Sequence, residues 1–142
     1  MRVSLTTPRG ALVDTQAEEV SAPGVLGEFG VLPGHISFFS VLRPGVLVCR
    51  GKQWQKTYAV GEGILQVART PEGEDKVLVL VDLAASAEEI DKAAAVKDLA
   101  QVDNDLSHWK KEIGGEYQAL VTRRDWAQAR VDAAGRSTPS AH

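Results

Sequence analysis

The chain has 142 residues, 44% hydrophobic and 25% charged, which are the proportions of an ordinary globular protein able to bury one sizeable core. Its formal net charge of −3 lacks the excess of Lys and Arg that nucleic-acid binding needs. The longest apolar run, Val77 to Val81, is far shorter than the roughly 18 residues of a membrane-spanning helix. Cys49 is the one cysteine, so an intramolecular disulfide is excluded and a reducing compartment is favoured.

Residues 1–86 have the pattern of an all-β domain. Most of the glycines and five of the six prolines fall there, with short segments of alternating apolar and polar residues between them. The alternation starts at the N-terminus, which therefore predicts a strand and not the continuous apolar block of a signal peptide. Seven strands are predicted, at Arg2–Thr7, Ala17–Ala22, Ser37–Leu42, Gly45–Arg50, Trp54–Val60, Gly63–Val67 and Lys76–Asp82. Strands this short and this closely spaced are typical of a sandwich or barrel.

Two helices are predicted after the strands. Residues 87–113 contain no glycine or proline, and Ser86 with Glu89 three residues later predicts a capping box at their start. The apolar positions of this first helix fall on one face, at Ala95, Leu99, Val102, Leu106, Trp109 and Ile113. Gly114-Gly115 ends the helix, and a second helix is predicted from Glu116 to Ala134. Its apolar face comprises Tyr117, Leu120, Val121, Ala127, Val131 and Ala134.

The predicted fold class is α+β, with an N-terminal antiparallel β-sandwich followed by a C-terminal antiparallel two-helix hairpin. The boundary between them follows from the change of apolar period at Ser86, from alternation to a helical step. The predicted domains are residues 1–86 for the sandwich, 87–134 for the hairpin and 135–142 for a disordered tail.

Sequence motifs of catalytic or nucleotide chemistry are not found. Gly24, Gly27 and Gly30 have the spacing of a glycine-rich loop, but no predicted helix follows that would present its N-terminus to a phosphate. Gly61-Glu62-Gly63 lies between two predicted strands, where glycines are typical of a bulge or tight corner. The sequence therefore favours a binding protein over an enzyme.

The residues that could bind metal are scattered along the chain. The three histidines are His35, His108 and His142. They fall in a turn, a helix and the tail without a second ligand at metal spacing, so no metal site is predicted. Cys49, inside a predicted strand, is expected to be a buried filler. Asp103 and Asp105 point away from each other on the first helix and are expected to be solvated.

Two stretches of the sequence resemble one known family. The first is Ala-Pro-Gly-Val-Leu-Gly-Glu-Phe-Gly-Val-Leu-Pro-Gly-His at residues 22–35, followed by Leu-Arg-Pro-Gly-Val at 42–46. It is similar to the signature of the epsilon subunit of F-type rotary ATP synthases, in which a Gly-Glu-Leu-Gly-Ile-like loop precedes Pro-Gly-His and then Leu-Lys-Pro-Gly. The second, Tyr58–Val67 with Val77–Ala84, resembles that family's later strands. The resemblance covers residues 1 to 134 and is stronger in the sandwich.

The resemblance implies a non-catalytic rotor subunit without cofactors. Such a subunit lies in the central stalk at the cytoplasmic face of the bacterial plasma membrane, and it couples the gamma subunit to the c-ring during ion-driven ATP synthesis. By the family's pattern, the loop of Gly27, Glu28, Phe29 and Gly30 faces the c-ring. Pro33, Gly34 and His35 then help to form the side that contacts gamma.

The resemblance also implies a regulatory role for the hairpin. In this family the helices fold beside the sandwich or extend along gamma toward the alpha and beta subunits, where they obstruct ATP hydrolysis. Some members bind ATP there through Ile-Asp-x-x-Arg-Ala, and the matching positions here are Ile90, Asp91 and, in place of the arginine, Ala94. Because a guanidinium that could contact phosphate is lost, ATP sensing is disfavoured.

Arginines of the second helix form a further candidate site. Arg123 and Arg130 are seven residues apart and lie within about 20° of each other around the helix, with Trp126 beside them. This basic strip is interpreted either as a solvated face or, as the resemblance implies, as a surface that meets acidic segments of the catalytic subunits. Arg124 falls inside the apolar face and is expected to extend its head outward or to pair with an aspartate of the first helix.

A second class of protein remains open from composition alone. An adaptor with a β-sandwich and a dimerising helical hairpin would have the same proportions and the same elements, and only the motif at residues 22–46 counts against it. Capture of gamma in a pull-down would distinguish a rotor subunit from such an adaptor, which should associate with itself through the apolar helix face.

Overall fold

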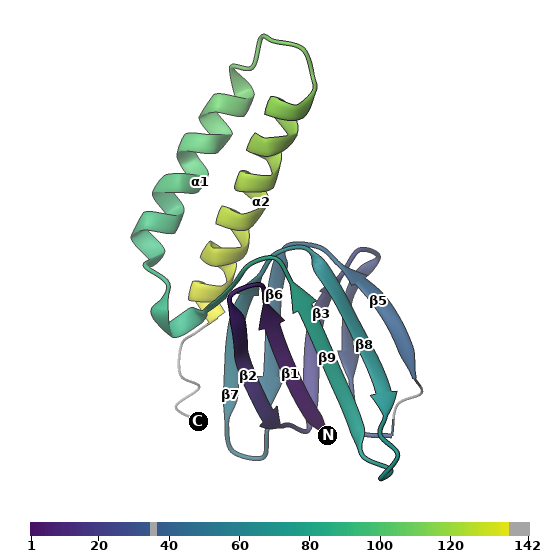
Figure 1. Cartoon of the computed structure of the whole chain (residues 1–142). Coiled ribbons are helices and arrows are strands. Elements are labelled where there is room, and N and C mark those ends of the chain that lie inside the picture. The colour runs from purple at the N-terminus through teal and green to yellow at the C-terminus, as the bar shows by residue number, and fades with distance from the viewer. Residues whose placement is uncertain (35–36, 137–142) are drawn as a thin grey trace.

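The computed structural model of the chain describes residues 1–34 and 37–136 (Figure 1). The strands are β1 Arg2–Thr7, β2 Gly10–Gln16, β3 Glu19–Gly24, β4 Gly27–Val31, β5 Phe38–Leu42, β6 Gly45–Arg50, β7 Gln55–Val60, β8 Gly63–Arg69, β9 Asp75–Val81 and β10 Ala84–Ser86. A short 3-10 turn, Ala87–Glu89, leads to the helices α1 Lys92–Ser107 and α2 Gly115–Arg136. The predicted α+β class, a β-sandwich followed by a helical hairpin, is confirmed.

The strands form one path that folds over itself into a sandwich. Their order is β10-β7-β6-β3-β5-β8-β9-β1-β2, and β4 pairs with β3 beside this path. All the pairs in the described residues are antiparallel except β1 with β9, where Val3 lies opposite Val77 in parallel register. This pair departs from the predicted antiparallel arrangement because its two strands are joined by no hairpin, so turn geometry does not impose their direction.

Three strands have no counterpart among the seven that the sequence predicts. They are β2, β4 and β10. In β2 only Val13 is buried, so the alternation that marks a strand is almost absent. β4 was not predicted because two of its five residues are glycines, which disfavour strands. β10 was not predicted because it has three residues, all of intermediate burial. The predicted strand at 17–22 is displaced, since β3 begins at Glu19 and continues through Pro23 to Gly24.

One core fills the sandwich between its two layers. Its largest fully buried side chains include Val3, Leu5, Leu42, Leu47, Leu65, Val77 and Val79. They come from alternate positions of their strands, as a two-layer sandwich requires. Cys49 is fully buried in the same core, which confirms the predicted filler, and burial raises the pKa of its thiol to about 11.

The first helix differs from its prediction at both ends. The capping box at Ser86 and Glu89 is wrong: Ser86 makes no side-chain cap to the 3-10 turn, and α1 starts only at Lys92, where the carboxylate of Asp91 accepts a hydrogen bond from the Ala94 N–H at 3.1 Å. Between Ser86 and Lys92 the chain buries Ala87 against the sandwich, with Ile90 packed beside it. This contact separates the 3-10 turn from α1.

At its other end α1 stops at Ser107, six residues before the predicted Ile113. The connection to α2 is held by Trp109, whose indole N–H donates to the Glu112 carbonyl at 3.2 Å and whose ring packs edge-on against Tyr117 at 5.6 Å between centroids. Trp109 and Ile113 therefore do not continue the helical face, and Ile113 is exposed. Within the described residues neither helix is both long and apolar enough to cross a membrane.

The second helix packs on the sandwich through alanines. Ala129 and Ala133, with Trp126 beside them, contact a patch of β6 and β7 formed by Val46, Val48 and Ala59. The predicted apolar face of this helix is only partly right, because Ala127 is buried whereas Tyr117, Leu120, Val121, Val131 and Ala134 are half-buried. The helix continues through Gly135 and Arg136, the first residues of the predicted tail; residues 137–142 lie outside the described part of the chain.

Candidate functional site

The predicted c-ring contact loop is a β-hairpin arm with an ordered turn. Gly27 has a φ of +131° and follows the tip, Val25-Leu26, and Gly27–Val31 then form β4. The Phe29 ring packs edge-on against Phe38 at 5.7 Å. A Cβ at position 24 would lie 2.9 Å from that ring, so glycine there is what lets Phe29 lie across the hairpin. The segment presents a rigid surface.

Glu28 is the charged residue of this hairpin. Its side chain is exposed on β4, and its carboxylate accepts a hydrogen bond from the Ser21 hydroxyl of β3 at 2.8 Å. Two main-chain bonds attach the tip to the neighbouring β5: the Val25 N–H donates to the Val41 carbonyl at 3.1 Å, and the Arg43 N–H donates to the Pro23 carbonyl at 2.9 Å. The carboxylate is therefore displayed from a fixed backbone.

The predicted gamma-contact turn is held by a residue that sequence reasoning missed. Gly34 has a φ of +84°, and its N–H donates to the Asp75 carboxylate at 2.7 Å across 41 residues of sequence. Asp75 also accepts from the Arg69 guanidinium at 3.3 Å. The Gly34 N–H first, and then Arg69, hold the pKa of the Asp75 carboxyl below its ordinary value. His35, the third residue of that predicted contact, lies outside the described residues.

An exposed apolar surface lies on β5, β9 and the tip of the β3–β4 hairpin. This outer apolar patch comprises Val25, Leu26, Phe39, Val41 and Leu80. Leu26 is fully exposed and Phe39 is 60% exposed, and Val41 and Leu80 are both paired through Ile64 of β8. Apolar residues gathered at one place on a surface are typical of a protein interface.

The sequence did hold a signal for the outer apolar patch. The run Val77 to Val81 is apolar at every position, and a strand with that pattern has two apolar faces. Val77, Val79 and Val81 are buried in the core, so the residues between them point outward.

The Ile90-Asp91-x-x-Ala94 segment forms the start of α1. Asp91 and Ala94 are joined by the helix cap already described, and Ile90 packs on the cluster below α2. Asp91 therefore acts as the N-cap of α1, and Ala94, three residues later, supplies the N–H that its carboxylate accepts. Ala94 is exposed and brings no cation to this site.

The two arginines of the predicted basic strip differ in environment. Arg123 is exposed, whereas the Arg130 guanidinium lies 3.2 Å from the Asp98 carboxylate of α1 and over the Trp126 ring at 5.7 Å. Arg124 forms an ion pair with Asp103 at 2.8 Å, which confirms the predicted pairing with an aspartate of the first helix.

Asp103 is exposed, as the sequence predicts, and in addition the hairpin brings Arg124 of the second helix to its carboxylate. Asp105 accepts from the Gln101 side chain of its own helix at 3.1 Å. The difference arises from which side of α1 each carboxylate occupies, since two residues apart on a helix are about 200° around its axis.

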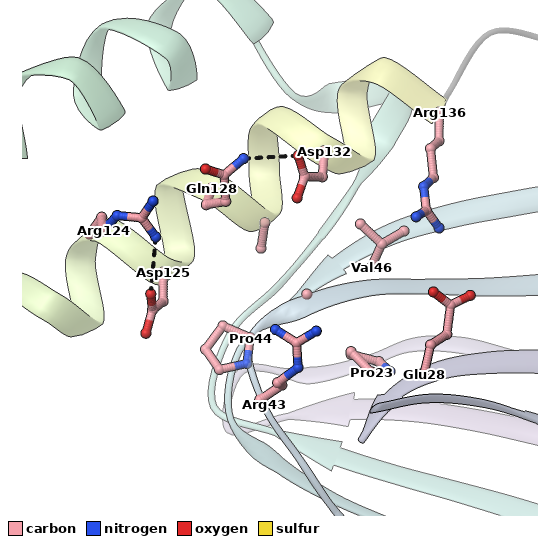
Figure 2. Close-up of a pocket in the computed structure, with 12 residues that line it drawn as sticks. Pro23, Glu28, Arg43, Pro44, Val46, Arg124, Asp125, Gln128, Asp132 and Arg136 are labelled. Atoms are coloured by element: carbon pink, nitrogen blue, oxygen red, sulfur yellow. Dashed lines mark hydrogen bonds and ion pairs between the residues drawn. The ribbon is translucent and has the colours of Figure 1, made fainter. Parts of the chain in front are cut away.

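A cavity of about 220 Å³ lies between α2 and the sandwich (Figure 2). Its charged and polar lining is Glu28, Arg43, Arg124, Asp125, Gln128, Asp132 and Arg136. Figure 2 shows Arg136 of α2 and Glu28 of β4 on opposite sides of the same space. Three arginines are matched there by three carboxylates, so the cavity has no net formal charge. At this cavity β4, which carries Glu28 of the predicted c-ring contact loop, lies next to helix α2.

These surfaces define a class of protein. The described residues hold no group of three His, Cys, Asp or Glu side chains that could bind a metal ion, and what the fold displays instead is a stiff sandwich with an ordered contact hairpin, an apolar patch and a helical hairpin resting on a small contact. This is the architecture of a subunit that works by contact with other chains.

Comparison with known proteins gives the family. A family model described as the beta-sandwich domain of the ATP synthase delta/epsilon chain matches residues 1–87. The ATP synthase epsilon chain of Anaeromyxobacter sp. (strain K) is 37% identical over 136 residues, which are 96% of this chain and 98% of that one. The epsilon chain of Myxococcus xanthus is 33% identical over 94% of each chain. The chain belongs to the family of ATP synthase epsilon chains, and it is a non-catalytic subunit.

Solved structures share the fold. A chain from the cryo-EM structure of the Euglena gracilis mitochondrial ATP synthase, OSCP/F1/c-ring in rotational state 1, superposes with a TM-score of 0.67 at 19% identity, over 94% of this chain and 76% of that chain. A chain from the central stalk and c-ring of the Tetrahymena thermophila mitochondrial enzyme gives 0.59 at 18% identity, over 94% and 96%.

Proposed function

We propose that the protein is a central-stalk rotor subunit that couples gamma to the c-ring during ion-driven ATP synthesis, at the cytoplasmic face of a bacterial plasma membrane. The observation that carries this proposal is that the similarity to ATP synthase epsilon chains extends over both the sandwich and the hairpin, in a chain whose sandwich matches the family model. A coupling piece has to transmit torque, and a two-layer sandwich is stiff because its core is close-packed.

Gamma is the partner proposed for the outer apolar patch. An interface that persists through rotation has to be long-lived, and permanent interfaces are more apolar than transient ones. The Pro33–Gly34 turn, held by Asp75, is proposed to contact gamma as well. The hairpin of Gly27 to Gly30, with the Glu28 carboxylate displayed from β4, is proposed to face the polar loops of the c-ring.

Co-purification tests the gamma contact. Tagged full-length protein co-expressed with gamma should retain gamma through a salt wash, and Val41→Lys should lose it because a charge is placed inside an apolar contact. Leu12→Lys is the matched control, since Leu12 is an exposed leucine of β2 outside the outer apolar patch. Self-association without capture of gamma would contradict the proposal and favour an adaptor.

The helical hairpin is proposed to inhibit ATP hydrolysis when it extends and contacts the alpha and beta subunits, with Arg123 and Arg130 meeting acidic segments there. Support comes from the small contact that holds α2 on the sandwich, in which the fully buried side chains of α2 are the alanines Ala129 and Ala133. Alanines bury little apolar area, so this contact costs little to separate.

ATP sensing is not part of the proposed function. Because Ala94 occupies the position of the motif's arginine, isolated protein should bind ATP weakly or not at all in a calorimetric titration. One-to-one binding in the micromolar range would show that other basic residues build an ATP site.

A further inference from the structure

The two helices of the hairpin carry opposite charges where they meet. Arg124 Nε lies 2.8 Å from Asp103 Oδ1, and Arg130 Nη2 lies 3.2 Å from Asp98 Oδ2. In both pairs the arginine belongs to α2 and the carboxylate to α1. The buried side chains of α1 are Ala95 and Val102, and Ala127 of α2 is buried between Arg124 and Arg130 in the sequence.

We propose that Asp98 and Asp103 of α1 are an internal substitute for the carboxylates of an acidic partner surface, and that they occupy the arginines of α2 until the helices separate. The inference rests on the proposed function, in which α2 meets acidic segments when the hairpin extends. The new element is that Asp98 and Asp103 compete with the partner's carboxylates for Arg124 and Arg130. In the folded position the helical hairpin therefore masks its own binding surface.

The geometry of the pairs fits an exchangeable contact. The side chains of Arg124 and Asp103 are 38% and 49% exposed, and those of Arg130 and Asp98 are 22% and 53% exposed. Ion pairs with this much solvent contact are weak because water and salt screen them. A partner carboxylate can therefore replace each aspartate without first leaving a charge buried and unpaired.

Arg130 also has unused capacity. Its Nε is buried and has no hydrogen-bond partner among the described residues, so Asp98 reaches only one side of the guanidinium. Arginine binds carboxylates best through two parallel N–H bonds, which the Asp98 contact does not supply. The centroid of the Trp126 ring lies 5.7 Å from the Cζ of Arg130, and this contact holds the guanidinium in place. A partner carboxylate that took both N–H groups would bind this arginine better than Asp98 does.

A binding experiment on the full-length protein separates masking from a merely structural role. The probe is fluorescently labelled poly-L-glutamate at low salt, followed by anisotropy, with circular dichroism and a thermal melt to show that each variant is folded. The variant D98N/D103N should bind the probe about fivefold or more tightly, because Arg130 loses its ion-pair partner and Arg124 keeps only the 3.5 Å pair with Asp125 of its own helix. Adding R124A/R130A to that variant should abolish the gain.

The matched control is D105N/E112Q, which makes the same change in net charge within the hairpin. Asp105 bonds only to Gln101 of its own helix and Glu112 accepts at its carbonyl, so neither side chain reaches an α2 arginine in the described contacts. Its affinity for the probe should equal that of the wild type. A folded D98N/D103N variant that binds no more tightly than the wild type, or no more tightly than this control, would overturn the proposal.

The inhibitory function is read out separately. In a reconstituted synthase, D98N/D103N should lower ATP hydrolysis below that of the wild-type complex, because the unmasked arginines bind the catalytic subunits more readily. A gain of affinity for poly-glutamate with unchanged hydrolysis would support the masking and contradict the proposed target of the hairpin. Loss of both effects would overturn the masking itself.

Discussion

Asp75 shows how one side chain can order a contact surface far from it in sequence. It lies in a polar segment, Glu-Asp-Lys, where nothing but charge marks it, yet its carboxylate fixes the backbone of Gly34, which is 41 residues away in the sequence. Long-range hydrogen bonds of this kind leave no periodic signal, so the turn was predictable from Pro33-Gly34 but its anchor was not. The apolar residues of β6, β8 and β9 were predictable because apolar runs of strand length, bounded by turn residues, indicate buried strands.

The Asp75 anchor predicts a pH effect. The pKa of its carboxyl is lowered in the folded protein, so its stabilisation is present above the unfolded value of about 3.9 and is lost as the pH falls through the folded value. Asp75→Asn should melt at a lower temperature than the wild type at pH 7, and the difference should shrink as the pH falls below about 4. Melting followed by circular dichroism measures this. A difference that stayed constant down to pH 2 would count against the anchor.

Gly63 marks a close approach of two backbones. A Cβ at this position would collide with the Leu80 carbonyl of the neighbouring strand β9, so the corner between β7 and β8 tolerates only glycine there. Gly63→Ala should lower the free energy of unfolding by about 2 kcal/mol or more, because backbone atoms have to move. Urea denaturation gives the value. Gly114→Ala, where an added Cβ meets nothing within 4 Å, should change it by less than about 0.5 kcal/mol.

At the scale of elements, the sequence predicted which segments form strands and helices, but it failed for the ends of α1, which are set by tertiary contacts. Seven strands and two helices follow from period alone. The start of α1 does not, because Ala87 and Ile90 are drawn onto the sandwich and the helix has to begin again at Asp91. The end of α1 is likewise set by Trp109 folding onto Tyr117. Both boundaries depend on contacts that the local sequence does not encode.

The sandwich is predicted to fold without the hairpin. All the strands that the structure describes end by Ser86, so a fragment of residues 1–86 keeps the whole sheet and loses only the cover over Val46, Val48 and Ala59. It should unfold cooperatively at a lower temperature than the full chain, because a shorter chain buries a smaller share of its surface. A fragment without dispersed amide resonances or a cooperative melt would show that the boundary is misplaced.

The docking of α2 should be sensitive to a single alanine. Ala133 is fully buried against the sandwich, so Ala133→Asp places a carboxylate in an apolar contact and should weaken docking by about 2 kcal/mol or more. Hydrogen exchange of the α2 and β6 amides should then rise together while the sandwich core stays protected. Ala119→Asp, at an exposed position of the same helix, is the control and should leave exchange unchanged.

For the whole molecule, the two proposed contact regions use different strands. The hairpin rests on β6 and β7, and the outer apolar patch lies on β5, β9 and the tip of the β3–β4 hairpin (Figure 1). In the proposed assignment, gamma would therefore stay bound whether the hairpin is folded or extended. The cavity in Figure 2 is bordered by Glu28 from the sandwich and by Arg136 from α2, and none of the residues of the outer apolar patch lines it.

Deletion of residues 87–142 tests this separation in a reconstituted synthase. Assembly should be intact because the patch is untouched, and ATP hydrolysis should rise because the helices proposed to inhibit it are gone. Arg123→Ala with Arg130→Ala should give part of that rise. The proposed inhibition should weaken as salt increases, since salt screens exposed ion pairs. Unchanged hydrolysis after the deletion would leave coupling as the protein's one proposed role.

The parallel pair of β1 and β9 has a consequence for biogenesis. β1 lies in the sheet between β2 and β9, and Val3 and Val77 face each other across 74 residues of chain (77 − 3). During translation, β1 and β2 can form a hairpin early, but the sheet cannot close on their other side before β9 has left the ribosome. Contacts between such distant segments slow folding, because the long loop loses its entropy before the pairing stabilises it. The sandwich should therefore be completed only after β9 has been synthesised, shortly before the two helices emerge. The helices then find the surface of β6 and β7 already formed when they dock.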